Sequence, residues 1–237
     1  MKVLNKILAF TLVLVLSIVS GFVIFKSNYL ETVGKNTNRP VIILDAGHGG
    51  FDGGAVAGDG TLEKDINLNM ALNVNEMLKS CGYDVILTRD TDVGTESDPS
   101  ASISKRKVSD LKNRLKLINS YESGIFVSIH LNKFTTSTAN GAQVFYSKNN
   151  AKSSVLGQSI QNSIVELLQP ENERVIKQGT KSTYLLYNAQ IPSVIVECGF
   201  LSNAAELKKL KNENYQKEMS FAIFCGILNY INKECLF

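Results

Sequence analysis

The sequence predicts an α/β domain in which helices flank a central, mostly parallel or mixed β-sheet, with a hydrophobic helix ahead of the domain. From Pro40 onward, short runs rich in β-branched residues alternate with longer runs whose apolar residues recur every three or four positions. This is the pattern of strands alternating with amphipathic helices. Before the domain, Ile7–Phe25 is an uncharged, mainly apolar run. The overall composition, 44% hydrophobic and 20% charged, is that of an ordinary globular protein.

Residues 1–26 are predicted to be an export signal that remains as a membrane anchor. About 20 apolar residues span a bilayer as a helix, whereas the core of a cleaved signal peptide usually has about 7–15. Lysines flank the run on both sides, and the bulky Ile18 makes Ser20-Gly21 a poor cleavage site. A buried core helix is the alternative, but such helices rarely have so few polar positions.

Residues 27–39 are polar and irregular, so we expect a linker there, followed by one domain at residues 40–237. This domain is expected on the outer side of the cytoplasmic membrane, either anchored or secreted. Removing the three anchor lysines from the 25 basic residues leaves 22, which equals the 22 acidic residues. A formally neutral external domain does not predict nucleic-acid binding.

Four cysteines show neither CxxC spacing nor a regular disulfide framework. They are Cys81, Cys198, Cys225 and Cys235. A domain of this size does not need disulfides to fold, so we expect free, buried thiols, with one bridge as the alternative.

The strand and helix patterns alternate along the domain. Strands are predicted at Val41–Asp45, Asp84–Thr88, Ile125–Ile129, Ala142–Tyr146 and Val194–Glu197. Helices are predicted at Asp65–Ser80, Arg106–Tyr121, Lys152–Leu168, Ala204–Leu210 and Tyr215–Asn232. Gly82 is a natural stop for the first helix. Thr91–Ser104 is rich in Asp, Gly and Ser and is predicted to be a surface loop, either functional or disordered.

The chain has two histidines, and each is placed at the end of a predicted strand. His48 follows VIILD within a Gly-His-Gly-Gly sequence, His130 ends GIFVSIH, and Glu197 ends VIVE. Sites in open α/β sheets form outside the carboxyl ends of strands, so these groups converge on one edge if the strands run parallel. A single histidine at a strand end is more often a structural residue. Two of two, one of them among glycines that allow close backbone approach, favour a functional site.

Two imidazoles and a carboxylate are a common zinc set for hydrolysis, because a fourth position stays open for water. Glu63 is a candidate third ligand, although most glutamates are solvated surface charges. Glu197 follows apolar strand residues, so we expect it to be partly buried and to need a partner or a task. The HExxH helix and the GxSxG elbow are both absent. A Cys198 nucleophile is disfavoured, because neighbours along a strand face opposite sides.

Four motifs resemble the zinc-dependent N-acetylmuramoyl-L-alanine amidases of the type 3 family. They are LDAGHGG, LEKDINL, the SIHLN around His130 and the VECGFLSN around Glu197. They occur in the family's order and cover about residues 40 to 232. The resemblance implies a single α/β domain and peptidoglycan as substrate. It also implies one Zn²⁺ bound by His48, Glu63 and His130, with Glu197 as the catalytic carboxylate.

Within this family, the chain is most similar to the CwlD-type amidases of spore-forming bacteria. The segment DPSASISKRKVSDLKNRLKLIN and the absence of wall-binding repeats add to that similarity. It implies a role in sporulation and germination, in which cortex peptidoglycan is prepared for maturation in the spore intermembrane space. The short interval from His130 to Gly141 leaves no room for an autoinhibitory helix. Any regulation is therefore expected from a separate protein, such as an activating lipoprotein at the membrane.

Further roles follow from the proposed chemistry. Asp45, Asp65 and Asn132 are candidates for orienting the ligands. Arg89 and Arg114 are candidates for contacting substrate carboxylates, with solvated or structural roles as the alternative. Two other functions stay open: a zinc peptidase that acts within the stem peptide, and a membrane-anchored wall-binding protein without catalysis.

Overall fold

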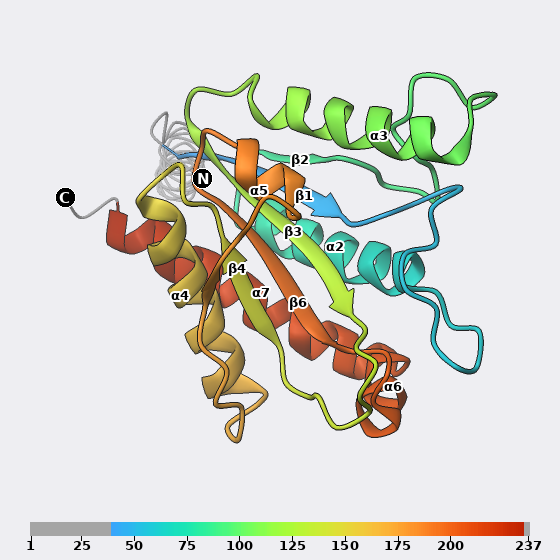
Figure 1. The fold of residues 1–237 in the computed structure, drawn as a ribbon. Coiled ribbons are helices and arrows are strands. Elements are labelled where there is room, and N and C mark those ends of the chain that lie inside the picture. Colours follow the sequence, from blue (N-terminus) through green and yellow to red (C-terminus); the bar gives the residue numbers. More distant parts are fainter. Residues whose placement is uncertain (1–38, 235–237) are drawn as a thin grey trace, which may run out of the picture. The chain divides into compact units, whose positions relative to one another are not determined.

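A single mixed sheet organises the part of the chain that the computed structural model describes, residues 39–234. The predicted anchor, residues 27–38 of the predicted linker and Cys235 lie outside the described residues. The strand order is β2-β1-β3-β6-β4-β5 (Figure 1). The strands are β1 (Val41–Ala46), β2 (Val85–Leu87), β3 (Gly124–Asn132), β4 (Gln143–Tyr146), β5 (Lys177–Gln178) and β6 (Ser193–Phe200). The predicted α/β class with a mostly parallel, mixed sheet is confirmed.

The strands that precede the candidate site residues run parallel. β1 pairs in parallel with β2 and β3, and β3 pairs in parallel with β6. Their sequences are almost continuously apolar, as is usual for strands covered on both faces. β4 is antiparallel to β6, and β5 is parallel to β4. The carboxyl ends of β1, β3 and β6 therefore meet at one edge of the sheet (Figure 1).

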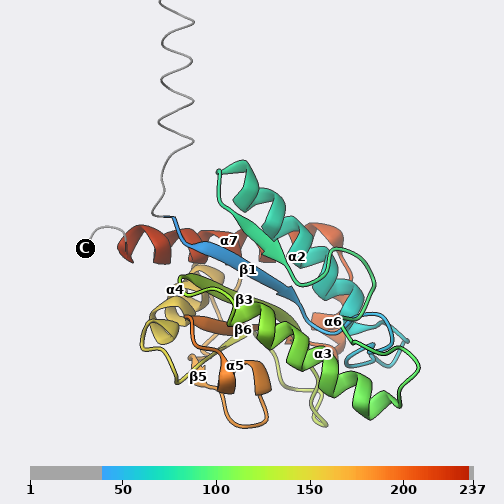
Figure 2. The ribbon, with the colours of Figure 1, turned by 90° about the horizontal axis from the view of Figure 1, so that it is seen from above.

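Helices cover both faces of the sheet. The helices are α2 (Glu63–Ser80), α3 (Ile103–Ile118), α4 (Lys152–Leu167), α5 (Tyr184–Asn188), α6 (Ala204–Leu210) and α7 (Glu213–Glu234). α2, α4 and α7 pack their apolar residues on one face and form the larger core. α3 and α5 lie on the opposite face from α2 and α7 (Figure 2), where a smaller cluster includes Ile43, Ile118 and Phe126. The residues at the carboxyl ends of β1, β3 and β6 lie at the edge of the sheet, beyond these two cores.

Two short elements were not predicted, β5 and α5. β5 has two exposed residues at the sheet edge and α5 has five, so neither is long enough to give a periodic pattern. α3 begins at Ile103, within the predicted loop 91–104. The rest of this loop is tied to α3, because Asp110 accepts hydrogen bonds from Thr95 and Glu96 pairs with Arg106.

The cysteines and the helices bear on two further expectations. Cys198 is buried and Cys225 is half-buried, but Cys81 is exposed, so the prediction of buried thiols is wrong for Cys81. Cys81 caps the C-terminus of α2, where the next residue, Gly82, has a φ of 77° as the predicted stop requires. Among the helices of residues 39–234, none is long and apolar enough to cross a bilayer.

Candidate metal centre

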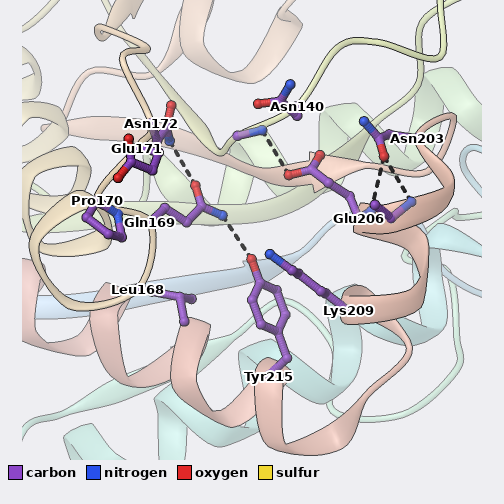
Figure 3. Close-up of a pocket in the computed structure, with 12 residues that line it drawn as sticks. Asn140, Leu168, Gln169, Pro170, Glu171, Asn172, Asn203, Glu206, Lys209 and Tyr215 are labelled. Atoms are coloured by element: carbon purple, nitrogen blue, oxygen red, sulfur yellow. Dashed lines mark hydrogen bonds between the residues drawn. The ribbon is translucent and has the colours of Figure 1, made fainter.

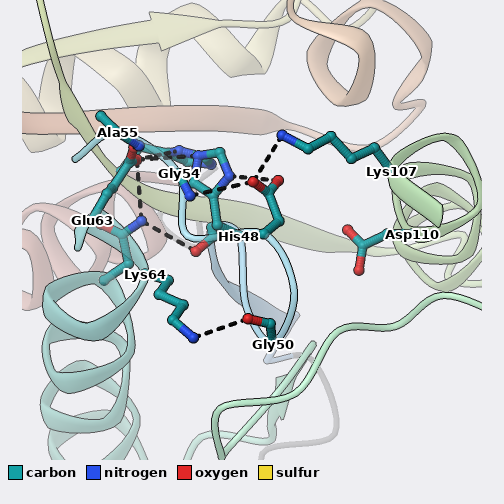
Figure 4. Close-up of polar contacts among 12 residues, drawn as sticks. His48, Gly50, Gly54, Ala55, Glu63, Lys64, Lys107 and Asp110 are labelled. Atoms are coloured by element: carbon teal, nitrogen blue, oxygen red, sulfur yellow. Dashed lines mark hydrogen bonds and ion pairs between the residues drawn. The ribbon is translucent and has the colours of Figure 1, made fainter. Parts of the chain in front are cut away.

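The loop after β1 aims the His48 imidazole inward. His48 has a φ of 62° and is the only residue other than glycine with a positive φ within residues 39–234; Gly49 and Gly50 beside it also have positive φ values. Nδ1 of His48 lies 2.9 Å from Oδ2 of Asp52, which fixes the ring and leaves Nε2 to face Glu63 (Figure 4). Nε2 lies 3.4 Å from Oε1 of Glu63. A tight left-handed turn therefore directs the second ring nitrogen of His48 into the site.

Glu63 is the first residue of α2 and is almost fully buried. Its Oε2 accepts a hydrogen bond of 2.8 Å from the Ala55 amide, and its Oε1 accepts one of 3.0 Å from the Leu131 amide. Burial raises the pKa of Glu63, but hydrogen bonds and charge attraction to His130 and His48 outweigh this and hold the pKa far below its usual range. Glu63 is therefore an ionised ligand candidate and not a surface charge.

His130 brings the second imidazole from β3. Its Nδ1 lies 2.9 Å from Oε1 of Glu63, and the two imidazole rings meet edge to face with centroids 4.9 Å apart. One donor atom from each of His48, Glu63 and His130 lies within 4.8 Å of the others. The structure thus brings His48, Glu63 and His130 together, and their role as metal ligands stays a prediction.

The donor set fits a divalent metal such as zinc. Two neutral imidazoles and one carboxylate suit Zn²⁺ and leave a coordination position open. Burial lowers the pKa of His48, but hydrogen bonds to Asp52 and Glu63 outweigh this and raise the pKa to about 9. Binding of a metal ion to His48 would therefore release a proton from its ring.

Glu197 lies beside the two imidazoles and Glu63. On β6 it stands directly opposite His130 of β3, so the two side chains share one face of the sheet. Its Oε2 is buried and has no hydrogen-bond partner among the described residues. Burial raises the pKa of Glu197 to about 7; nearby Glu63 adds to the rise, while His130 and His48 oppose it. Cys198, the next residue, faces the opposite core and its pKa is raised by burial, so it is no nucleophile here.

Arg89 and Arg114 are not placed to contact a substrate. Both are 3% exposed, and both hold the loop that carries His48 by hydrogen bonds to its backbone. Arg89 donates to the carbonyl oxygens of Ala46, Gly47, Lys64 and Thr91. Arg114 pairs with Asp45 and Asp110 and donates to the carbonyl oxygen of His48. The expectation of substrate contact is wrong for both, and the structural alternative is correct.

The predicted orienting residues are also elsewhere. Asp45 bonds to Arg114, Thr88 and Ser128 and not to a ligand candidate. Asp65 is exposed, and the Asn132 side chain accepts a hydrogen bond from the Lys133 amide. These residues therefore do not orient the imidazoles or Glu63 by direct contact.

Asp52 and Asn67 take the orienting roles instead. Asp52 bonds to His48, and Lys107 of α3 binds the other Asp52 oxygen at 2.9 Å (Figure 4). Asn67 donates to Oε1 of Glu63 and to the Gly47 carbonyl, each at 3.2 Å. Each is four residues after the group it holds. On α2 this spacing places Asn67 on the face of Glu63, which the helical pattern could have shown.

Comparison with known proteins agrees with this geometry. The profile of the Amidase_3 family, described as N-acetylmuramoyl-L-alanine amidase, matches residues 42–229. The chain belongs to the N-acetylmuramoyl-L-alanine amidase family. This amidase is therefore a hydrolase of peptidoglycan, and the family resemblance of the four sequence motifs is confirmed.

Individual relatives extend the match. The amidase is 38% identical, over 82% of its chain and 81% of the relative, to the germination-specific N-acetylmuramoyl-L-alanine amidase of Bacillus subtilis. It is 42% identical, with a TM-score of 0.79, to the CwlD amidase of Clostridioides difficile solved in complex with the GerS lipoprotein, and covers all of that chain with 83% of its own. The amidase AmiC2 of Nostoc punctiforme is 29% identical, with a TM-score of 0.70 over 81% of this chain and 97% of that one.

Proposed function

We propose that this amidase uses one Zn²⁺, held by His48, Glu63 and His130, to cleave the amide between N-acetylmuramic acid and L-alanine. The observation that carries the proposal is the buried, unpartnered Oε2 of Glu197 beside three convergent donor groups. A buried carboxylate oxygen without a partner is costly, and such a group is typical of a functional site. The fold of the relatives and their names support the same chemistry.

Glu197 is the proposed general base and acid. Its Oε2 takes a proton from the attacking water while the water oxygen bonds to the lactyl carbonyl carbon. Glu197 then returns this proton to the alanine nitrogen as the carbon–nitrogen bond breaks. A pKa of about 7 suits a group that must accept and release a proton near neutrality. Bound zinc would supply Lewis acidity, which activates water and polarises the carbonyl.

Glu197→Gln tests this assignment. The amide cannot accept the proton, so we expect turnover to fall by about 10²–10⁴-fold while the zinc content stays at the wild-type level. The full-length protein in detergent is incubated with zinc and purified peptidoglycan, and mass spectrometry follows the release of stem peptides with a free L-alanine amino terminus. Near-normal turnover in Glu197→Gln would remove Glu197 from the proton transfer.

The same mass spectra separate the other two functions. A peptidase within the stem would release shorter peptides and leave L-alanine attached to the glycan. A wall-binding protein would leave the material intact.

A spore-cortex role is the finer part of the proposal. The B. subtilis relative is named germination-specific, and the C. difficile neighbour was solved with a lipoprotein. On this basis, we place the enzyme outside the cytoplasmic membrane, in the spore intermembrane space, held by residues 1–26 and activated by a lipoprotein partner.

A further inference from the structure

One hollow beside the sheet is lined by polar groups that already bond to one another within the protein. It measures about 370 Å³ and lies between the end of α4, α6 and the start of α7 (Figure 3). Its polar groups satisfy one another: Gln169 accepts from Asn172 and donates to Tyr215, and Glu206 accepts from the Gly141 amide. None of the charged side chains that line it has a buried polar atom without a hydrogen-bond partner.

A row of polar side chains leads from the candidate metal centre across the sheet. His130 of β3 stands opposite Glu197 of β6, and Glu197 stands opposite Gln143 of β4. Residues directly opposite in neighbouring strands point to the same face. Gln143 is thus the next side chain after Glu197 on the substrate side of the sheet.

Gln143 fixes a loop segment beside Glu197. Its Nε2 donates to the Val175 carbonyl at 2.8 Å, and its Oε1 accepts from Nη1 of Arg174 at 3.1 Å. Both functional groups of this buried amide are used to hold residues 174–175. This hydrogen bond therefore holds Arg174 next to Gln143, and Gln143 is the cross-strand neighbour of Glu197, the proposed catalytic carboxylate.

Arg174 is held firmly but has no acidic partner. Its Nε donates to the Asn140 carbonyl at 2.6 Å, and its guanidinium lies 4.7 Å from the ring centre of Phe200. Within residues 39–234 it forms no ion pair with a carboxylate, and its Nη2 makes no hydrogen bond. By contrast, Arg106 pairs with Glu96 and Arg114 with Asp45. Arg89 also lacks a carboxylate partner in this part of the chain, but it is 3% exposed and its donors are taken by backbone carbonyl oxygens. A preorganised guanidinium without a counter-ion is a suitable receptor for a carboxylate.

The surroundings of Arg174 leave room for such a group. A hollow of about 320 Å³ lies between residues 138–140 and 171–174 and is lined in part by Arg174. Glu171 and Glu173 at its rim are exposed to solvent, and neither forms an ion pair with Arg174. The guanidinium charge is therefore not neutralised by direct contact with its neighbours.

We propose that Arg174 binds a carboxylate of the acidic stem peptide and so sets the enzyme's preference for stems with free carboxylates. This proposal rests on the proposed amidase function. Strands lie about 4.7–4.9 Å apart, so the backbone of Gln143 is about 10 Å from that of His130 across two strand spacings, and Arg174 lies one side chain farther away. An extended peptide spans about 3.3–3.6 Å per residue, so this distance corresponds to about three stem residues beyond the scissile amide. A free carboxylate on a stem residue at or beyond this distance is the group that the guanidinium would bind.

The test measures binding without requiring turnover. The probes are an N-acetylmuramoyl tripeptide with free carboxylates on its second and third residues and the same compound with those groups as carboxamides. Both are titrated calorimetrically into full-length, zinc-loaded Glu197→Gln in detergent. We expect the carboxylate form to bind about 10- to 100-fold more tightly, and Arg174→Gln in the same background to lose this preference.

Matched variants separate a charge contact from a structural effect. Arg174→Lys keeps the charge but loses the planar guanidinium that Asn140 and Gln143 hold in place, so part of the preference should remain. Lys148→Gln removes a cation stacked on Tyr187 near the opposite end of β4, and should leave the preference unchanged. Zinc content and thermal unfolding are recorded for each variant. If Arg174→Gln does not fold, the test is whether Arg174→Lys shows a reduced preference for the carboxylate form.

Two outcomes would contradict the proposal that Arg174 binds a stem carboxylate. One is equal binding of the two probes by the Glu197→Gln protein, and the other is an equal loss of affinity for both probes in Arg174→Gln. Failure of the proposed function has a different signature, namely that the wild-type protein releases no L-alanine-terminated stem from peptidoglycan. The two results are obtained with different proteins and do not depend on each other.

Discussion

At the scale of single residues, the candidate metal centre depends on how closely the backbone approaches the imidazoles. Gly47 follows β1 directly, and a Cβ atom built there would lie 2.2 Å from Nε2 of His130. Gly54 has a φ of 70°, and its Cβ would lie 2.7 Å from both Oε2 of Glu63 and Cδ2 of His48. Real Cβ atoms do not make such contacts, so a side chain at either position must displace a proposed ligand.

Gly47→Ala tests this packing. The new methyl group must push His130 away from Glu63, so we expect zinc affinity to fall at least about tenfold and activity to fall with it, since the metal-binding geometry is lost. Zinc affinity is measured by competition with a chelating dye, and the fold by circular dichroism. Gly58→Ala is the matched control, because nothing lies within 4 Å of a Cβ at Gly58. Wild-type zinc affinity in Gly47→Ala would show that His130 does not need its present position.

At the scale of elements, α3 is joined to the end of β1 through a buried ion pair. Arg114 of α3 and Asp45 of β1 are 3% and 1% exposed, and Asp45 also accepts hydrogen bonds from Ser128 at 2.5 Å and Thr88 at 2.6 Å. Burial raises the pKa of Asp45, but charge attraction to Arg114 and His130 and these hydrogen bonds outweigh it and hold the pKa at about 2. The pair fixes the base from which the His48 loop departs.

This ion pair predicts a loss of stability in acid. The pKa of Asp45 falls from 3.8 in the unfolded chain to about 2 in the folded chain. The ionised form therefore contributes about 2 kcal/mol to the free energy of unfolding above pH 4, which is lost as the pH falls through about 2. In Asp45→Asn we expect several kcal/mol less stability at pH 7, because the buried Arg114 loses one of its two acidic partners and keeps only Asp110, with the gap to the wild type closing below pH 4.

Urea unfolding followed by circular dichroism, at a series of pH values with chelator present, measures this gap. Asp59→Asn is the control, since Asp59 and Lys211 form an exposed pair whose loss should change the stability little. A gap between Asp45→Asn and the wild type that stays constant down to pH 2 would contradict the linkage.

At the scale of the whole molecule, the site lies where the carboxyl ends of β1, β3 and β6 meet. The C. difficile neighbour was solved with a lipoprotein, and we propose a similar partner for this enzyme. A partner that binds the zinc-loaded form preferentially must, by linkage, raise the affinity for zinc.

We therefore expect the full-length protein to bind zinc and turn over substrate at least about tenfold better with its lipoprotein partner than without it. Zinc competition and stem-peptide release, each measured with and without the partner, check this expectation. A lipoprotein of unrelated sequence serves as the control. Full zinc loading and full turnover of the purified chain alone would show that no activating partner is needed.

Patterns within the sequence were enough to predict the α/β class and the convergence of His48, His130 and Glu197. Strand and helix periodicity is local, and three polar groups at the ends of parallel strands must meet at one edge. The role of Glu63 followed only from the family resemblance, because a single glutamate before a helix has no distinguishing pattern. The structure then placed its side chain between the two imidazoles.

Other features depended on contacts between distant parts of the chain. The sequence could not show that Arg89 and Arg114 are buried beneath the loop, or that Arg174 lies next to Gln143. These contacts follow from strand order and register: β4 runs antiparallel beside β6, which places Gln143 opposite Glu197. By itself, the sequence determined the longer helices and strands and which groups end the central strands, but not the short β5 and α5. Only the tertiary structure decided that Arg89 is buried among backbone carbonyl groups and that Arg174 is held beside Gln143 without a carboxylate partner among the described residues, because such contacts depend on distances in space and not on spacing along the chain.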